Sequence, residues 1–106
     1  MNYLEFDLNG LDTKELTAKL SFDIATSRAS GFPLIKFVFN ELMGDKFKKA
    51  LTARLRDMKK NGRIELFASS DDFLNKTTGA EYLLNKFPTL KDQAMKESDI
   101  YFYVRI

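Results

Sequence analysis

Five carboxylates of this chain fall at or just after the ends of expected strands: Asp7, Glu41, Asp45, Asp71 and Asp72. In open α/β sheets, ligands bind outside the carboxyl ends of the strands, and carboxylates gathered there could hold Mg²⁺ for phosphodiester hydrolysis. Aspartate is also a common cap and turn residue, a role that suits Asp12 and Asp45. One hypothesis is therefore a magnesium-dependent nicking endonuclease with these candidate catalytic residues: Asp7, Glu41, Asp71 and Asp72.

Histidine and cysteine are both absent from the chain. Without histidine the commonest general base and the commonest transition-metal ligand are missing, and without cysteine there is neither a disulfide nor a thiolate nucleophile. We expect no cofactor, and Mg²⁺ enters only with the nuclease hypothesis.

Basic side chains concentrate in residues 46–63, which hold eight of the seventeen Lys and Arg, opposed there only by Asp57. Because the whole chain carries a net charge of +2, this excess is a local feature. Pairs spaced i,i+4 cannot neutralise it, whereas a nucleic acid could and would release its own counterions. The candidate phosphate-binding residues are Lys46, Lys48, Lys49, Arg56, Lys59, Lys60 and Arg63.

Wholly apolar side chains alternate with tyrosine and arginine in the last segment, 100–106. Ile100, Phe102, Val104 and Ile106 fall on one side, and Tyr101, Tyr103 and Arg105 on the other. The tyrosines could stack on unpaired bases. They could instead be covered by a helix or by a second copy of the chain. A third hypothesis is therefore a protein-interaction or dimerisation module that uses Tyr101 and Tyr103. Under this hypothesis the protein could form a homodimer.

Hydrophobic periodicity predicts four strands and three helices. The strands are expected at 3–8, 34–40, 63–68 and 100–106, and the helices at 12–30, 46–60 and 76–87. The basic residues then lie on the second helix, whose apolar face is formed by Phe47, Ala50, Leu51, Leu55 and Met58. We expect 69–72 to be a polar turn and 88–98 to be a polar connection.

This order of elements predicts one α/β domain covering residues 1–106, built as a two-layer α/β sandwich. We expect a mainly parallel four-stranded sheet with an antiparallel last strand, and the first two helices on one face. The other face would be partly open, showing Tyr3, Glu5, Lys36, Phe67, Tyr101, Tyr103 and Arg105. The N-terminus does not resemble a signal peptide, and no apolar run approaches the roughly 18 residues of a membrane span. We therefore expect a cytoplasmic protein without membrane contact.

Two loop motifs resemble those of the small MutS-related (Smr) domain family. Asp7-Leu8-Asn9-Gly10 lies at the position of the family's aspartate-leucine-histidine-glycine motif at the end of the first strand. Asn40-Glu41-Leu42-Met43-Gly44 lies where the second strand of the family ends in histidine-glycine-x-glycine before a basic helix. The later segments 60–64, 71–73, 82–88 and 90–91 look like compact stand-alone members. The motif positions are Asp7, Asn9, Gly10, Asn40 and Gly44.

The resemblance implies DNA or RNA binding, and for some members nicking endonuclease activity. This chain departs from the family pattern because Asn9 and Asn40 replace the two histidines and Glu41 replaces a glycine. Asparagine can hold a hydrogen bond but cannot exchange a proton near neutral pH. We therefore expect a nucleic-acid-binding Smr-like domain that contacts phosphates through residues 46–63 and has no nuclease activity.

Overall fold

The computed structural model describes residues 3–91 and 100–106. Ten helices, 3-10 turns and strands are defined within these residues. The strands are β1 (Tyr3–Asp7), β2 (Leu34–Phe39), β3 (Leu66–Ser69) and β4 (Ile100–Arg105). The α-helices are α1 (Leu16–Ala29), α2 (Gly44–Lys60), α3 (Ser70–Asn75) and α4 (Thr78–Lys86). Two single 3-10 turns, η1 (Thr13–Glu15) and η2 (Glu41–Met43), precede α1 and α2.

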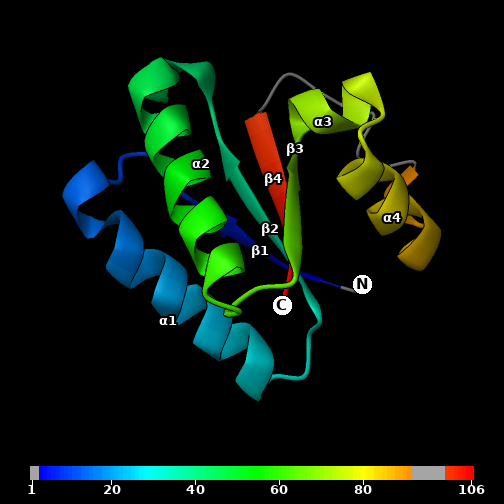
Figure 1. Ribbon diagram of the computed structural model, residues 1–106. Helices are drawn as coiled ribbons and strands as arrows, with labels where there is room; N and C mark the ends of the chain where they lie inside the picture. Colours follow the sequence, from blue (N-terminus) through cyan, green and yellow to red (C-terminus); the bar gives the residue numbers. More distant parts are fainter. Residues whose placement is uncertain (1–2, 92–99) are drawn as a thin grey trace.

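The four strands form one mixed sheet in the order β1-β2-β4-β3. β1 pairs with β2 in parallel, and β4 pairs antiparallel with both β2 and β3. The α/β class and the antiparallel last strand are thus confirmed, whereas the expectation of a mainly parallel sheet is wrong. Because β4 lies between β2 and β3, one reversed strand makes two of the three pairings antiparallel. The carboxyl ends of β1, β2 and β3 still lie at one edge of the sheet (Figure 1).

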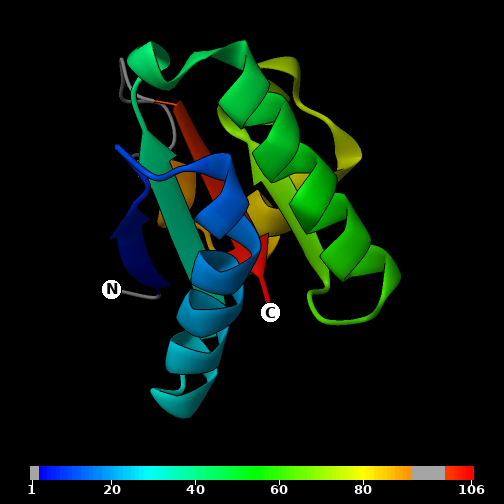
Figure 2. The ribbon, with the colours of Figure 1, turned by 90° about the vertical axis from the view of Figure 1, so that its left-hand side faces the viewer.

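Helices cover both faces of the sheet, so the chain forms three layers instead of the expected two. α1 and α2 pack on one face, where they face the viewer in Figure 2, and α3 and α4 lie on the other (Figure 1). The expected polar turn at 69–72 instead begins α3. Ser69 caps this helix by accepting from the Asp72 N–H, while the Asp72 carboxylate accepts from the Ser69 N–H at 2.8 Å. This reciprocal capping box satisfies two otherwise unpaired donors and allows so short a helix to form.

A buried cluster fills the space between the sheet and the first two helices. It contains Ile35, Phe37 and Phe39 of β2 with Phe102 and Val104 of β4, against apolar residues of α1 and α2. Alternation along each strand places these side chains on one face. The Phe39 ring packs edge-on against Phe47 of α2, with 5.1 Å between the centroids.

A second cluster lies on the opposite face and includes both tyrosines of β4. Tyr103 is fully buried and Tyr101 is 6% exposed, and the Phe73 ring of α3 lies 5.6 Å and 6.0 Å from their ring centroids. Of the alternatives for these tyrosines, cover by helices of the same chain is therefore the correct one, and a partly open tyrosine face is wrong. Tyr3 is also buried, at 6% exposed. Burial raises the pKa of the Tyr103 hydroxyl, because desolvation disfavours the charged phenolate form.

Candidate nucleic-acid interface

The basic helix α2 attaches to the sheet through one apolar stripe. Phe47, Leu51, Leu55 and Met58 are all buried, and their spacing places them on one face of a helix. Asp45 in the first turn and Lys59 and Lys60 in the last complement the helix dipole. The sequence prediction for this helix is confirmed, although it begins two residues earlier, at Gly44. That residue has a φ of +82°, which glycine adopts without strain.

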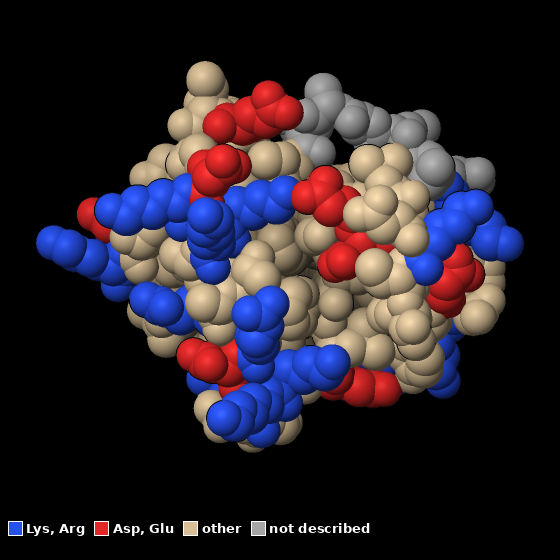
Figure 3. All heavy atoms as spheres, turned by 45° about the horizontal axis from the view of Figure 1, so that its top comes forward, with Lys and Arg blue, Asp and Glu red and all other residues tan. Residues whose placement is uncertain are grey.

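Basic side chains occupy the remaining faces of α2. Lys46, Lys49, Arg56, Lys59 and Lys60 are exposed, as is Arg63 beyond the helix end. In Figure 3 the Lys and Arg side chains gather over the half of the molecule formed by α1 and α2. The structure thus brings these predicted residues to one side of the molecule.

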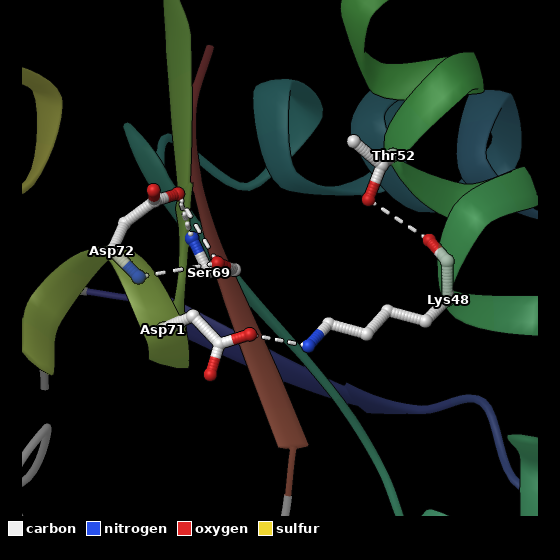
Figure 4. Close-up of polar contacts among 5 residues, drawn as sticks. All are labelled: Lys48, Thr52, Ser69, Asp71 and Asp72. Atoms are coloured by element: carbon white, nitrogen blue, oxygen red, sulfur yellow. Dashed lines mark hydrogen bonds and ion pairs between the residues drawn. The ribbon is translucent and has the colours of Figure 1, made fainter. Parts of the chain in front are cut away.

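Three of the eight basic residues are held by neighbouring elements. Arg54 Nε donates to Thr17 Oγ1 of α1 at 2.9 Å, and an Arg63 guanidinium nitrogen donates to Ser21 Oγ at 3.0 Å. Lys48 Nζ forms an ion pair with Asp71 of α3 (Figure 4). Within residues 3–91 and 100–106, Lys48 is the one member of the eight that has an acidic partner. The positive charges of the other seven are not neutralised by an acidic side chain of the described residues, so they can interact with an anionic ligand.

Three of the predicted carboxylates line a common hollow at the carboxyl edge of the sheet. Glu41, Asp45 and Asp71 share this hollow with Lys48, whose ammonium pairs with Asp71. The other two predicted carboxylates do not line it: the Asp7 carboxylate accepts from the Asn9 N–H at 2.8 Å, and Asp72 belongs to the capping box of α3. Among the described residues, no group of three His, Cys, Asp or Glu is arranged to hold a metal ion.

The two motif loops come together at this same edge. Asn9 Oδ1 accepts from the Asn40 N–H at 2.9 Å, and Asn40 Oδ1 accepts from the Leu42 N–H at 2.9 Å. The Gly10 N–H also points at Met43 Sδ, 3.3 Å away. Both asparagine carbonyls are therefore engaged in holding the backbone of the two loops, a task that needs an acceptor and no proton transfer.

Sequence reasoning missed a groove that lies between α2 on one side and α3 and α4 on the other. Its lining includes Thr52, Phe67, Thr77 and Gly79, none of which was proposed as a site residue. One signal was available, because Lys48, Thr52, Arg56 and Lys59 recur at the spacing of a single helix face. Phe67 could not be found because it was assigned to the wrong face of the sheet. It pairs in register with Val104 and faces α2, on the side of Phe102.

The tyrosine site proposed for protein interaction does not form an exposed surface. Tyr101 and Tyr103 are buried beneath α3, as described above. Of the described residues, the large hydrophobic side chains that are exposed are Phe22, Leu42 and Leu74, which belong to three different elements. No helix in the described part of the chain has the length and apolar content needed to cross a membrane.

Comparisons with protein-family models, with curated proteins and with solved structures find no match to this chain.

Proposed function

We propose that this chain is an Smr-like domain that binds nucleic acid through phosphate contacts of α2 and has no nuclease activity. The observation that carries the proposal is the excess of cations on α2, of which only Lys48 has an acidic partner among the described residues. Cations without partners that lie close together repel one another, and a polyanion removes this repulsion while releasing its condensed counterions.

The dimensions of α2 suit a run of phosphates. At 1.5 Å per residue, Lys46 and Lys60 are separated by about 21 Å along the helix axis. Phosphates of one strand are spaced about 3.4 Å apart along a duplex. Several consecutive phosphates could therefore meet the exposed residues Lys46, Lys49, Arg56, Lys59 and Lys60, and Lys48 could join them once released from Asp71.

The Smr-like part of the proposal is supported by the meeting of the two motif loops. The residues that carry the resemblance lie far apart in the sequence, yet Asn9 and Asn40 are directly hydrogen bonded. The absence of nuclease activity is proposed because neither asparagine can act as a general base. The Lys48 ammonium also lies among the carboxylates that would have to hold Mg²⁺, where it would compete with the metal through like-charge repulsion.

A salt titration of binding tests this function. The apparent affinity of the wild-type protein for nucleic acid should fall linearly on a log–log plot against salt, with a slope of about 0.7–0.9 for each phosphate neutralised. Changing Lys49, Arg56 and Lys60 to Glu should abolish binding at moderate salt. If the unmodified protein binds neither single strands nor duplex at low salt, the proposed function is wrong.

A matched control separates local charge from net charge. The exposed residues Lys14, Lys76 and Lys86 lie outside α2, and changing these three to Glu takes the net charge from +2 to −4, as the α2 triple variant does. The control variant should lose much less affinity, because screening limits charge effects to about 10 Å at 0.1 M salt. Equal losses in the two variants would mean that α2 is not the binding surface.

A further inference from the structure

The groove beside α2 combines charge with an accessible aromatic ring. It has a cavity volume of 510 Å³, within the range of about 300–1,000 Å³ typical of sites for small ligands. One side is α2, the base is the α2-facing surface of β3 and β4, and the other side is formed by the first turns of α3 and α4. Figure 3 shows basic side chains on the α2 side and acidic side chains on the α3 side. The residues that line this groove include Lys48, Arg56, Lys59, Phe67, Asp71 and Thr77.

The α2 side of the groove carries a row of cations. Lys48, Arg56 and Lys59 are spaced i, i+8 and i+11, which places them above one another on a helix. Thr52 lies between them, and its hydroxyl donates back to the Lys48 carbonyl at 2.8 Å (Figure 4). A chain of phosphates that follows α2 would meet this row along its whole length.

The base of the groove is aromatic. Phe67 is half-buried, and its ring is tilted against that of buried Phe102, with 6.4 Å between the centroids. Among the described residues β3 is an edge strand of the sheet. The part of the ring that remains open faces the same groove as the three cations.

The far side of the groove offers few free anions. The Asp72 carboxylate accepts from the Ser69 N–H and hydroxyl, and Asp71 is paired with Lys48 across the groove (Figure 4). Thr77 caps α4 by accepting from the Ala80 N–H. Gly79 lies beside β3, since a Cβ built there would make an ordinary contact of 3.7 Å with the Phe67 carbonyl oxygen.

We propose that this groove binds an unpaired nucleobase of a single strand, which stacks on Phe67 while the flanking phosphates contact Lys48, Arg56 and Lys59. The inference rests on the proposed function and adds the class of nucleic acid. In a duplex the bases are already stacked on one another, whereas an unpaired base offers its face to an aromatic side chain. A cationic row beside an aromatic ring is the arrangement that binds single strands with little sequence preference.

The decisive test replaces the aromatic ring without opening a large cavity. Phe67→Leu keeps apolar contact with Phe102 but removes the planar face. Phe22→Leu is the matched control, because Phe22 is 68% exposed on α1 and does not line the groove. Circular dichroism and thermal melting establish that both variants remain folded. Affinities are then measured at one salt concentration for single-stranded RNA, single-stranded DNA and a duplex.

The expected result is a loss of at least about fivefold in single-strand affinity for Phe67→Leu, with no change for Phe22→Leu. Duplex affinity should be unchanged, because duplex binding uses phosphates alone. Comparison of the RNA and DNA strands shows whether the sugar contributes. If wild-type protein binds strands and duplex and Phe67→Leu alters neither, the groove inference is overturned while phosphate binding by α2 stands. If nothing binds, the proposed function itself fails.

A photochemical experiment locates the base directly. A single strand that carries 5-iodouracil should crosslink to the tryptic peptide 64–76, which contains Phe67, follows Arg63 and ends at Lys76. The crosslinked residue should be Phe67, and the yield should fall for Phe67→Leu. Crosslinks found exclusively on peptides of α1 or of the outer face of α2 would place the base elsewhere and overturn the inference.

Discussion

The ion pair between Lys48 and Asp71 makes a prediction about affinity. A phosphate that contacts Lys48 must displace Asp71, so Asp71→Asn should tighten binding of a single strand. The Asp71 side chain is 59% exposed and that of Lys48 is 28% exposed, and pairs this exposed stabilise by about 0.2–1 kcal/mol. When Asp71 no longer competes with phosphate for Lys48, the affinity for a single strand should therefore rise by about 1.5- to 5-fold.

The salt dependence of binding provides a second measurement on the Asp71→Asn variant. Because a phosphate contacts Lys48 in the complexes of both proteins, the slope of log affinity against log salt should change by much less than about 0.7, the value for one additional phosphate of a single strand. Folding stability should fall by no more than about 1 kcal/mol, the cost of one exposed pair. Fluorescence anisotropy with a labelled oligonucleotide at several salt concentrations measures affinity and slope together.

Asp57→Asn is the matched control for this measurement. It removes one exposed negative charge from α2 itself, and Asp57 does not line the groove. It should give only the small gain that follows from a more positive net charge. Equal gains in the two variants, or a loss of affinity for Asp71→Asn, would refute the argument that Asp71 competes with phosphate for Lys48.

Two further predictions concern catalysis and pH. Purified protein with Mg²⁺ or Mn²⁺ should not nick supercoiled plasmid above a matched control; nicking that disappears on Asp7→Asn would replace the proposed function with the metal-nuclease alternative. Burial raises the pKa of Asp23 from its usual 3.8, and the hydrogen bond and ion pair with Lys19 offset this only in part. A raised folded-state pKa means that Asp23 adds stability when protonated, fully below 3.8, and that this stability is lost as pH rises through the folded-state pKa. Asp23→Asn should therefore be more stable than wild type at pH 7, and denaturant titrations should show that the difference in free energy of unfolding shrinks toward pH 4. If the wild type instead became more stable relative to the variant as pH rises, the inferred direction of the pKa shift would be wrong.

Local patterns were sufficient to predict most elements. Helix α2 follows from the spacing of Phe47, Leu51, Leu55 and Met58 with Gly62 beyond its end, and β4 follows from the alternation of residues 100–106. These features depend on neighbours within a few residues, which the sequence displays directly. The antiparallel direction of β4 was also expected correctly. Short α3 was missed because its capping box had been interpreted as a turn, and the two have similar sequences.

The candidate site was predicted only in part. The basic residues of α2 were identified, because a charge imbalance is visible without a structure. Phe67 was placed on the wrong face, because unbroken alternation was expected over 63–68. In the structure Ile64 belongs to the first buried cluster, whereas Leu66, where the strand begins, packs against the second. A slip of one residue moves every side chain of a strand to the opposite face. The buried state of Tyr101 and Tyr103 depends on Phe73, which is distant in sequence.

The sequence by itself determined the α/β class, the amphipathic basic helix and the absence of histidine and cysteine chemistry. Only the tertiary structure decided which charges remain free, since the partner of Lys48 is Asp71 on another helix and that of Arg54 is Thr17. It also decided that Asn9 and Asn40 meet and that Phe67 opens into a groove beside the cations. The physical reason is that periodicity assigns a residue to a face of its own element, whereas a binding site is made by the packing of elements that are remote along the chain.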